Sequence, residues 1–490
     1  MNQERTPGER LSRHHLFSPL LCLAVLAAAG CSGEVLGAGG AGTGGSTAVG
    51  GGGSATTTGT DTGASTGTST DTGTASAPAF DMEQTLSDGA QRTTLAFSGL
   101  AMITGNLESQ SFFPPGKVAD YTGFQYLRDN DPDNMGHNTS FLTRVANNVI
   151  FVLNDAQFAN LKDLAVGQMA SIDLYGYKRF TLMKAFRRLL EGDVPAGSTG
   201  LNPSAVKAAS HDLYMIDGQI SFDRALLYAN VLASLDAQQK AHLDAMKGKG
   251  FLSWPDIAKD QIDAKMKGLP KGTAVAVMTY ASDLYAWYAG SVEADVYFCP
   301  ERHGTYYGSF YIKDAPAIGH EGYSIDEQLT ATAGAALSDA NKGYVTKPQA
   351  ELMSSLVESQ RNNLYATGDE SIVGVRTKIA TLLRGLLVST ANSDAVKAQV
   401  LELSGLYGDL DGANNHAYAT VFAQVAATLT AEQKTKLFDL RKSIMSGTYA
   451  DGTPFDYSVC DTPFLYSQPI QDTSALEPYV GDTDALFFEP

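Results

Sequence analysis

Two stretches of this sequence bring histidine, tyrosine and paired charges together at matching spacings. They are FFPPGKVADYTGFQYLRDNDPDNMGHN (residues 112–138) and YFCPERHGTYYGSFYIKDAPAIGHE (residues 297–321). Their glycines and prolines favour ordered loops over helices, and loops carry functional residues more often than helices do. Imidazole, phenol and carboxylate groups held in one loop can ligate a metal or bind an anionic ligand. These loops are therefore the candidate functional site.

Each loop carries a tyrosine, a cation next to an aspartate, and a Gly-His dipeptide. The candidate ligand residues are Tyr121, Arg128, Asp129 and His137 in the first loop, and Tyr306, Lys313, Asp314 and His320 in the second. The second loop adds His303 and Glu321, which with Cys299 extend a candidate metal-ligand set. The first loop has Val118 at the position of His303, so the metal interpretation does not apply equally to both. The alternative is structural, because Tyr, Asp and His side chains often satisfy backbone groups in long loops.

The sequence gives no support for several well-known catalytic and binding chemistries. The sequence has no motif for covalent haem attachment, zinc proteolysis or phosphate binding. His211, His242 and His416 lie on helix-like segments and do not match between the two halves, so we expect solvated or capping roles for them. We therefore favour a non-enzymatic protein over an enzyme with a new site at the loops. The sequence does not identify a cofactor, and a metal at the loops is one possibility.

The helices that must position these loops begin at four similar phrases. They are LNDAQFANL, LDAQQKAHL, VTKPQAELM and LTAEQKTKL, which start at Leu153, Leu235, Val345 and Leu429. In each, a Thr, Asp or Asn is followed three residues later by Gln, which is the pattern of a reciprocal capping box. The predicted cap residues are Asn154, Gln157, Asp236, Gln239, Thr346, Gln349, Thr430 and Gln433. Each box predicts a helix start, and losing one such cap costs about 1 kcal/mol.

The boxes recur at a nearly fixed offset. The first pair is separated by 82 residues and the second by 84, and the two pairs are offset by 192 and 194. Other phrases match in the same order, among them NPSAVKA (residues 202–208) with NSDAVKA (residues 392–398). An internal duplication explains these matches.

Apolar residues after each box recur at three- and four-residue steps, which is typical of amphipathic helices. Strand-like pieces are few, and TAVAVMTYASDLYAWYA (residues 273–289) is compatible with a buried helix or a strand. We predict a mainly α protein with two tandem repeats of about four helices each and long ordered loops. The predicted boundaries are residues 84–270 for repeat 1, 271–465 for repeat 2, and 466–490 for a C-terminal tail.

The N-terminus has the pattern of an export signal. Arginines at positions 5, 10 and 13 precede a short apolar run that ends at Cys31. The sequence Ala-Ala-Gly-Cys resembles the bacterial lipobox, which implies that residues 1–31 are a lipoprotein signal and that Cys31 carries lipid. The alternative is an ordinary secretory signal. Ser32 follows instead of Asp, and the resemblance to sorted lipoproteins then implies the outer membrane, with a periplasmic or surface-exposed location.

Residues 32–80 are almost wholly Gly, Ser, Thr and Ala. Such a segment has too little apolar surface to offset its ordering entropy, so we predict a disordered, flexible linker. The net charge of −18 argues against nucleic acid or anionic lipid as a partner. The expected membrane contact is therefore the lipid anchor only.

Two cysteines, Cys299 and Cys460, remain after the predicted processing. In an exported chain they suggest one disulfide. Two free thiols or a metal-binding pair are the alternatives.

The paired boxes resemble the LTxxQ motifs of the Spy/CpxP family of periplasmic stress proteins. The resemblance is carried by Leu429, Thr430 and Gln433, and by Asp236 and Gln239 of the earlier box. It implies a helical cradle that holds unfolded protein clients, and some relatives sense metals. The resemblance covers only the boxes and their helices. In this sequence the two boxes of a pair are farther apart than in that family, and the pair occurs twice. We thus expect an exported lipoprotein with a duplicated binding module, or a metal- or small-ligand-binding protein that uses the Gly-His loops.

Overall fold

The computed structural model describes residues 86–105, 111–112, 120–133, 139–290, 294, 337–366, 371–444, 468–469 and 483–489. These residues are mostly helical, which confirms the prediction of a mainly α protein. All the described elements belong to one compact unit. Among the described helices, none is both long enough and apolar enough to cross a membrane.

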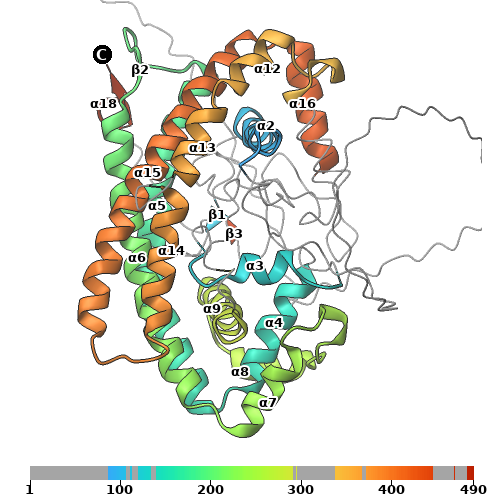
Figure 1. The fold of residues 1–490 in the computed structure, drawn as a ribbon, viewed down its shortest axis with the longest axis vertical. Coiled ribbons are helices and arrows are strands. Elements are labelled where there is room, and N and C mark those ends of the chain that lie inside the picture. The colour runs from blue at the N-terminus through green and yellow to red at the C-terminus, as the bar shows by residue number, and fades with distance from the viewer. Residues whose placement is uncertain are drawn as a thin grey trace, which may run out of the picture. The chain divides into compact units, whose positions relative to one another are not determined.

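Eight described helices precede residue 291 (Figure 1). They are α2 (Asp88–Thr104), α3 (Phe124–Asp129), α4 (Thr139–Val152), α5 (Asp155–Glu191), α6 (Pro203–Ala233), α7 (Ala237–Met246), α8 (Lys259–Met266) and α9 (Lys271–Ala289). The later helices are α12 (Lys347–Ser354), α13 (Val357–Tyr365), α14 (Ile372–Gly385), α15 (Ser393–Thr428), α16 (Ala431–Ile444) and α18 (Thr483–Phe487). Short 3-10 turns cover Phe251–Ser253 and Ala340–Lys342.

The described strands are only two residues long and form two antiparallel pairs. They are β1 (Ser111–Phe112) with β3 (Gln468–Pro469), and β2 (Gly200–Leu201) with β4 (Phe488–Glu489). In both pairs, a segment near the C-terminus meets a segment of the first half. The described parts of the predicted tail are therefore attached to the first half of the chain.

The sequence shows locally why the long helix α5 begins and ends where it does. The Asn154 side chain accepts from the Gln157 N–H, and the Gln157 side chain accepts in return from the Asn154 N–H. Gly192 ends the helix in the left-handed region at φ 74°, where glycine has no Cβ penalty. The next helix, α6, begins with Pro203 after an Asn202 cap, which is a favoured start.

Two central helices, α2 and α9, are buried on all sides. Every residue from Thr94 to Met102 in α2 is buried, and so is every residue from Thr279 to Trp287 in α9. The ambiguous segment of residues 273–289 is thus a helix, because its aromatic and β-branched residues pack on every face instead of alternating. Helix α9 packs against α4 and α5, whereas α2 packs against α12, α13, α15 and α16.

We call α3–α9 the first bundle and α2 with α12–α16 the second bundle. In sequence, α2 opens the first predicted repeat and α9 the second, yet each packs in the bundle built mainly by the other repeat. The two cores are also joined by the long helices. Ile379 of α14 lies in the core around Leu284, whereas Phe186 of α5 lies in the core around Leu100 and Phe422.

The closest packing between the halves lies between α6 and α15. A Cβ added to Gly218 would lie 2.2 Å from the Ser404 hydroxyl oxygen, and one added to Gly412 would lie 2.7 Å from the Ser210 Cβ. The two contacts are reciprocal, because the glycine of each helix meets the serine of the other. The absence of side chains at these positions lets the two backbones approach closely.

Candidate functional site

Much of the predicted loop site lies outside the described residues. The residues concerned are His137, Cys299, His303, Tyr306, Lys313, Asp314, His320 and Glu321, together with Cys31 and Cys460. Asp129 ends α3, but its side chain is not described. Tyr121 and Arg128 are described, and both are buried. Within the described ranges, no group of three or more His, Cys, Asp or Glu side chains is placed to hold a metal ion.

Within the first predicted loop, the structure describes residues 112 and 120–133, and the expectation of a loop without helix is wrong there: Phe124–Asp129 form α3, which starts at a turn of residues 120–123. The Asp120 carboxylate accepts from the backbone N–H groups of Phe124 (2.9 Å) and Gln125 (2.6 Å). The Thr122 hydroxyl donates to the same carboxylate at 3.0 Å. Gly123 has φ 78°, and a Cβ there would lie 2.6 Å from the Ala294 Cβ. The carboxylate and the glycine together fix the direction in which the chain enters α3.

Tyr121 points from this turn into the protein interior. Its ring lies edge-on to Tyr407 of α15 at 6.3 Å, and Tyr407 lies 4.7 Å from the Tyr214 ring of α6. Burial raises the pKa of Tyr121 well above its ordinary value, and the nearby Asp217 carboxylate raises it further. The phenol is therefore neutral at physiological pH and serves to anchor the turn where the two halves meet.

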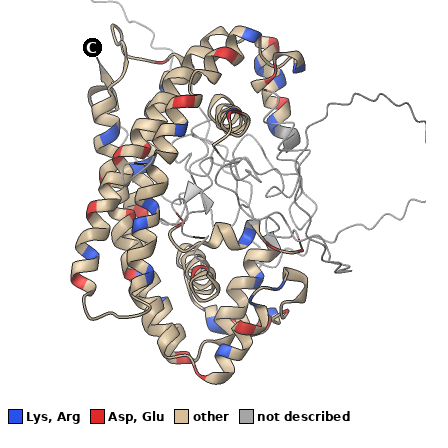
Figure 2. Cartoon of the chain, in the orientation of Figure 1, with Lys and Arg blue, Asp and Glu red and all other residues tan. Residues whose placement is uncertain are grey.

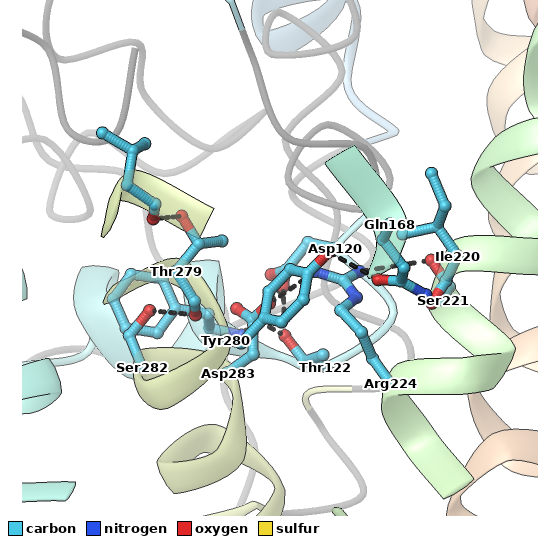
Figure 3. Close-up of polar contacts among 12 residues, drawn as sticks. Asp120, Thr122, Gln168, Ile220, Ser221, Arg224, Thr279, Tyr280, Ser282 and Asp283 are labelled. Atoms are coloured by element: carbon cyan, nitrogen blue, oxygen red, sulfur yellow. Dashed lines mark hydrogen bonds and ion pairs between the residues drawn. The ribbon is translucent and has the colours of Figure 1, made fainter. Parts of the chain in front are cut away.

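Next to this turn, a buried ion pair links α6 to α9 (Figure 3). Arg224 Nη1 lies 2.8 Å from Asp283 Oδ2, and the two side chains are 2% and 3% exposed. Arg224 also donates to the Ser221 hydroxyl, and its guanidinium lies over the Tyr280 ring. The Thr122 hydroxyl reaches Asp283 at 3.5 Å, which connects the turn to the ion pair.

Tyr280 extends this buried polar cluster to α5. Its hydroxyl donates to the Gln168 side chain at 2.6 Å, and the Gln168 amide donates to the Ile220 carbonyl at 3.3 Å (Figure 3). Burial raises the pKa of Tyr280 and of Tyr228, so both phenols stay protonated. Helices α5, α6 and α9 are thus held in register by polar contacts inside an otherwise apolar bundle.

A separate acid lies in the contact between α6 and α15. Asp411 accepts from the Tyr214 hydroxyl at 3.0 Å and from the Asn415 amide at 3.0 Å. Burial raises the pKa of Asp411 to about 7 despite these two donors. Asp411 lies in the middle of α15, and its neighbour Gly412 makes the close contact with Ser210.

All four predicted boxes lie at helix starts, and in the structure they form two corners. In the first corner, the Gln239 amide donates to the Gln157 side chain at 2.6 Å and to the Val152 carbonyl at 2.8 Å. The Gln157 amide donates to the Ser234 hydroxyl at 2.9 Å. The start of α5 is therefore fastened to the start of α7.

The second corner repeats this arrangement. The Gln433 amide donates to the Gln349 side chain at 2.8 Å and to the Tyr344 carbonyl at 3.2 Å. The Gln349 amide donates to the Thr428 hydroxyl at 3.0 Å. Both Thr346 and Thr430 take part in reciprocal boxes. The glutamine of each box thus caps its own helix and also joins it to the other box helix.

Three histidines outside the loops have structural partners. His211 lies 3.3 Å from Asp409, His242 lies 2.8 Å from the Asn148 side chain, and His416 lies 3.0 Å from the Leu201 carbonyl. They lie on α6, α7 and α15 and are not brought together.

Sequence reasoning did not identify the ion pair of Arg224 and Asp283 or the buried Asp411. One signal was available, because the dipeptide Asp-Gly occurs at Asp217 and again at Asp411, 194 residues later. An aspartate beside a helix-interior glycine in both halves indicates a close polar contact between helices.

The polar residues from the turn, α5, α6, α9 and α15 therefore form buried clusters whose described contacts hold helices together. No protein-family model, curated protein or solved structure matches this chain.

Proposed function

We propose that this chain is an exported outer-membrane lipoprotein whose folded part is a duplicated helical module that holds a protein client without catalysis. The observation that carries the proposal is the pair of glutamine corners. Gln157 and Gln349 make equivalent contacts at an offset of 192 residues, and Gln239 and Gln433 do so at an offset of 194. Because both halves keep this arrangement, it supports the proposal that the two repeats act in the same way.

Reciprocal contacts between the halves also support the duplication. The close approaches of Gly218 to Ser404 and of Gly412 to Ser210 have the form of a two-fold interface, in which each partner offers the same patch. The exchange of the central helices α2 and α9 has the same symmetry. The proposed module is therefore a dimer-like pair of repeats within one chain.

Labelling with a radioactive fatty acid tests whether Cys31 carries the proposed lipid anchor. The full-length chain is expressed in a Gram-negative host with radiolabelled palmitate, beside the variants Cys31→Ser and Cys22→Ser. We expect label and membrane sedimentation in the parent chain and in Cys22→Ser, but neither in Cys31→Ser, because Cys31 follows the apolar run at the cleavage position. Labelled Cys31→Ser would refute the proposed anchor.

Client holding is tested by light scattering from a heat-denatured model enzyme. The Cys31→Ser chain is expected to suppress aggregation at molar ratios near one, whereas serum albumin at the same concentration is not. A folded surface can contact apolar client segments through exposed apolar side chains, and Leu252 (68% exposed) and Val388 (91% exposed) are such residues in the two halves. The double variant Leu252→Ser, Val388→Ser should weaken suppression without changing the fold. No suppression by the parent chain at tenfold excess would remove the client-holding proposal.

The second candidate function is binding of a metal or small ligand at the Gly-His loops. It is favoured by the fixed turn at residues 120–123, because Asp120 and Tyr121 anchor this part of the first loop stretch. Metal analysis of the purified chain tests it with the variants His320→Ala and His416→Ala. A stoichiometric metal lost only in His320→Ala would support it. A metal-free parent chain, after purification without chelators and addition of Zn²⁺ or Ni²⁺, would exclude the metal form of this function.

A further inference from the structure

The contact between α6 and α15 contains an acid in a place that has little room for water. Asp411 is fully buried. Around it, a Cβ on Gly408 would lie 2.5 Å from the Ser210 carbonyl oxygen, and a Cβ on Gly405 would lie 2.4 Å from the His211 ring. A carboxylate that ionises in such a contact cannot be hydrated. Its ionisation therefore costs free energy unless the helices move apart and admit water.

One hydrogen bond of Asp411 crosses from one half to the other. Tyr214 of α6 donates to one carboxylate oxygen, and Asn415 of its own helix donates to the other. These two donors are neutral. Each stabilises a carboxylate by hydrogen bonding, but burial outweighs them. The protonation state of this acid is therefore coupled to how closely the two halves approach.

Other titratable and charged groups surround this contact. They are Lys207, His211, Tyr214 and Asp217 of α6, Tyr175 of α5, Arg376 of α14 and Tyr121 of the turn, with Tyr407 and Asp409 on α15 itself. One of these pairs, His211 with Asp409, also joins α6 to α15 and lies at the partly exposed margin of the contact. A variant of this pair is therefore the matched control for Asp411.

We propose that the contact between α6 and α15 is a proton-controlled joint, tight when Asp411 is protonated and loosened when Asp411 ionises. This inference is independent of the proposed client-holding function. The pKa of Asp411 is higher in the folded protein than in the unfolded chain, so its contribution favours the closed contact at low pH. That contribution is present in full below the unfolded pKa and is lost as pH rises towards about 7.

Amide hydrogen exchange of the full chain tests the joint. Protection factors of α6 and α15 peptides, corrected for intrinsic exchange, are compared at pH 6 and pH 8. With a folded pKa of about 7 and an ordinary value of 3.8, linkage gives a fall of about tenfold in the parent chain. We expect this fall to disappear in Asp411→Asn, which resembles the protonated acid, and to persist in Asp409→Asn.

Each alternative outcome has a definite meaning. An equal fall in Asp411→Asn and the parent chain would overturn the proposal, as would loss of the fall in Asp409→Asn alone. If Asp411→Asn does not fold, Tyr214→Phe provides the readout. Removing the Tyr214 hydroxyl takes away a bond that favours the carboxylate, so the midpoint of the fall should move to higher pH. An unchanged midpoint in a folded Tyr214→Phe would overturn the proposal.

Discussion

At the scale of single residues, the first bundle contains an ion pair that water barely reaches. Arg224 and Asp283 join α6 to α9, and their neighbours Ser221 and Thr122 also bond to them. Such a pair adds little net stability compared with a well-packed apolar replacement, because both ions must be desolvated. Removing only one partner is far more damaging, since the other charge remains buried and uncompensated.

The variant Asp283→Asn should therefore lower the free energy of unfolding by about 3–5 kcal/mol. Urea denaturation followed by far-UV circular dichroism measures this change. The double variant Arg224→Met, Asp283→Leu should lose less than Asp283→Asn alone, because no unpaired charge remains. Asp212→Asn is the matched control, since the Lys178–Asp212 pair is exposed and should contribute almost nothing. Equal effects of Asp283→Asn and Asp212→Asn would contradict this account.

At the scale of elements, glycines inside helices have opposite roles at different positions. Gly218 of α6 lies against Ser404, whereas Gly167 of α5 has no atom within 4 Å of its would-be Cβ. In a helix, alanine is favoured over glycine by about 1 kcal/mol when space allows. Of these two positions, Gly218 is therefore the one where the local helix preference and the helix contact conflict.

Gly167→Ala should raise the free energy of unfolding by up to about 1 kcal/mol. Gly218→Ala should lower it by about 1–3 kcal/mol, because the new methyl forces α6 and α15 apart. Thermal or urea unfolding of the two variants measures both effects in one experiment. A stabilised Gly218→Ala would mean that the Ser404 side chain simply rotates away and that the contact is not tight.

The helix starts were largely predictable from the sequence, whereas the tertiary contacts were not. A capping box is a local signal, so Asn154 and Thr430 identify their helix starts without any tertiary information. The segment around Tyr280 was ambiguous because a helix buried on all sides has no apolar stripe. The partner of Arg224 lies 59 residues away on another helix, and no local pattern specifies such a pairing.

At the scale of the whole molecule, some helices of each bundle contribute side chains to the core of the other. Helix α14 contributes to the core around α9, and α5 contributes to the core around α2. Both kinds of charge are interspersed along the described helices of each bundle (Figure 2). Because helices of each bundle contribute to the core of the other, we expect the folded part to unfold as one cooperative unit, although the sequence suggests two repeats.

The two tryptophans, Trp254 and Trp287, test this expectation, because both lie in the core of the first bundle. Phe422→Ala removes a buried ring from the second core and should cost about 3–5 kcal/mol. In a cooperative molecule, the tryptophan fluorescence transition in urea should shift with the circular dichroism transition. A fluorescence midpoint that stays unchanged in Phe422→Ala would show that the bundles unfold independently.

The attachment of α2 has a mechanical consequence. Three arginine side chains hold the two ends of α2. At its start, Arg361 bonds to Asp88 and to the Leu86 carbonyl. At its end, Arg441 donates to the Thr104 carbonyl, and Arg187 donates to the carbonyls of Met102 and Gly105. A force applied to the chain before Asp88 would therefore act on α2 first. It would be resisted by Arg361 and Arg441 of the second half and by Arg187 of α5. An anchor at the extreme N-terminus would therefore pull first on α2 in the second core, and the first bundle would receive that force through Arg187 of α5.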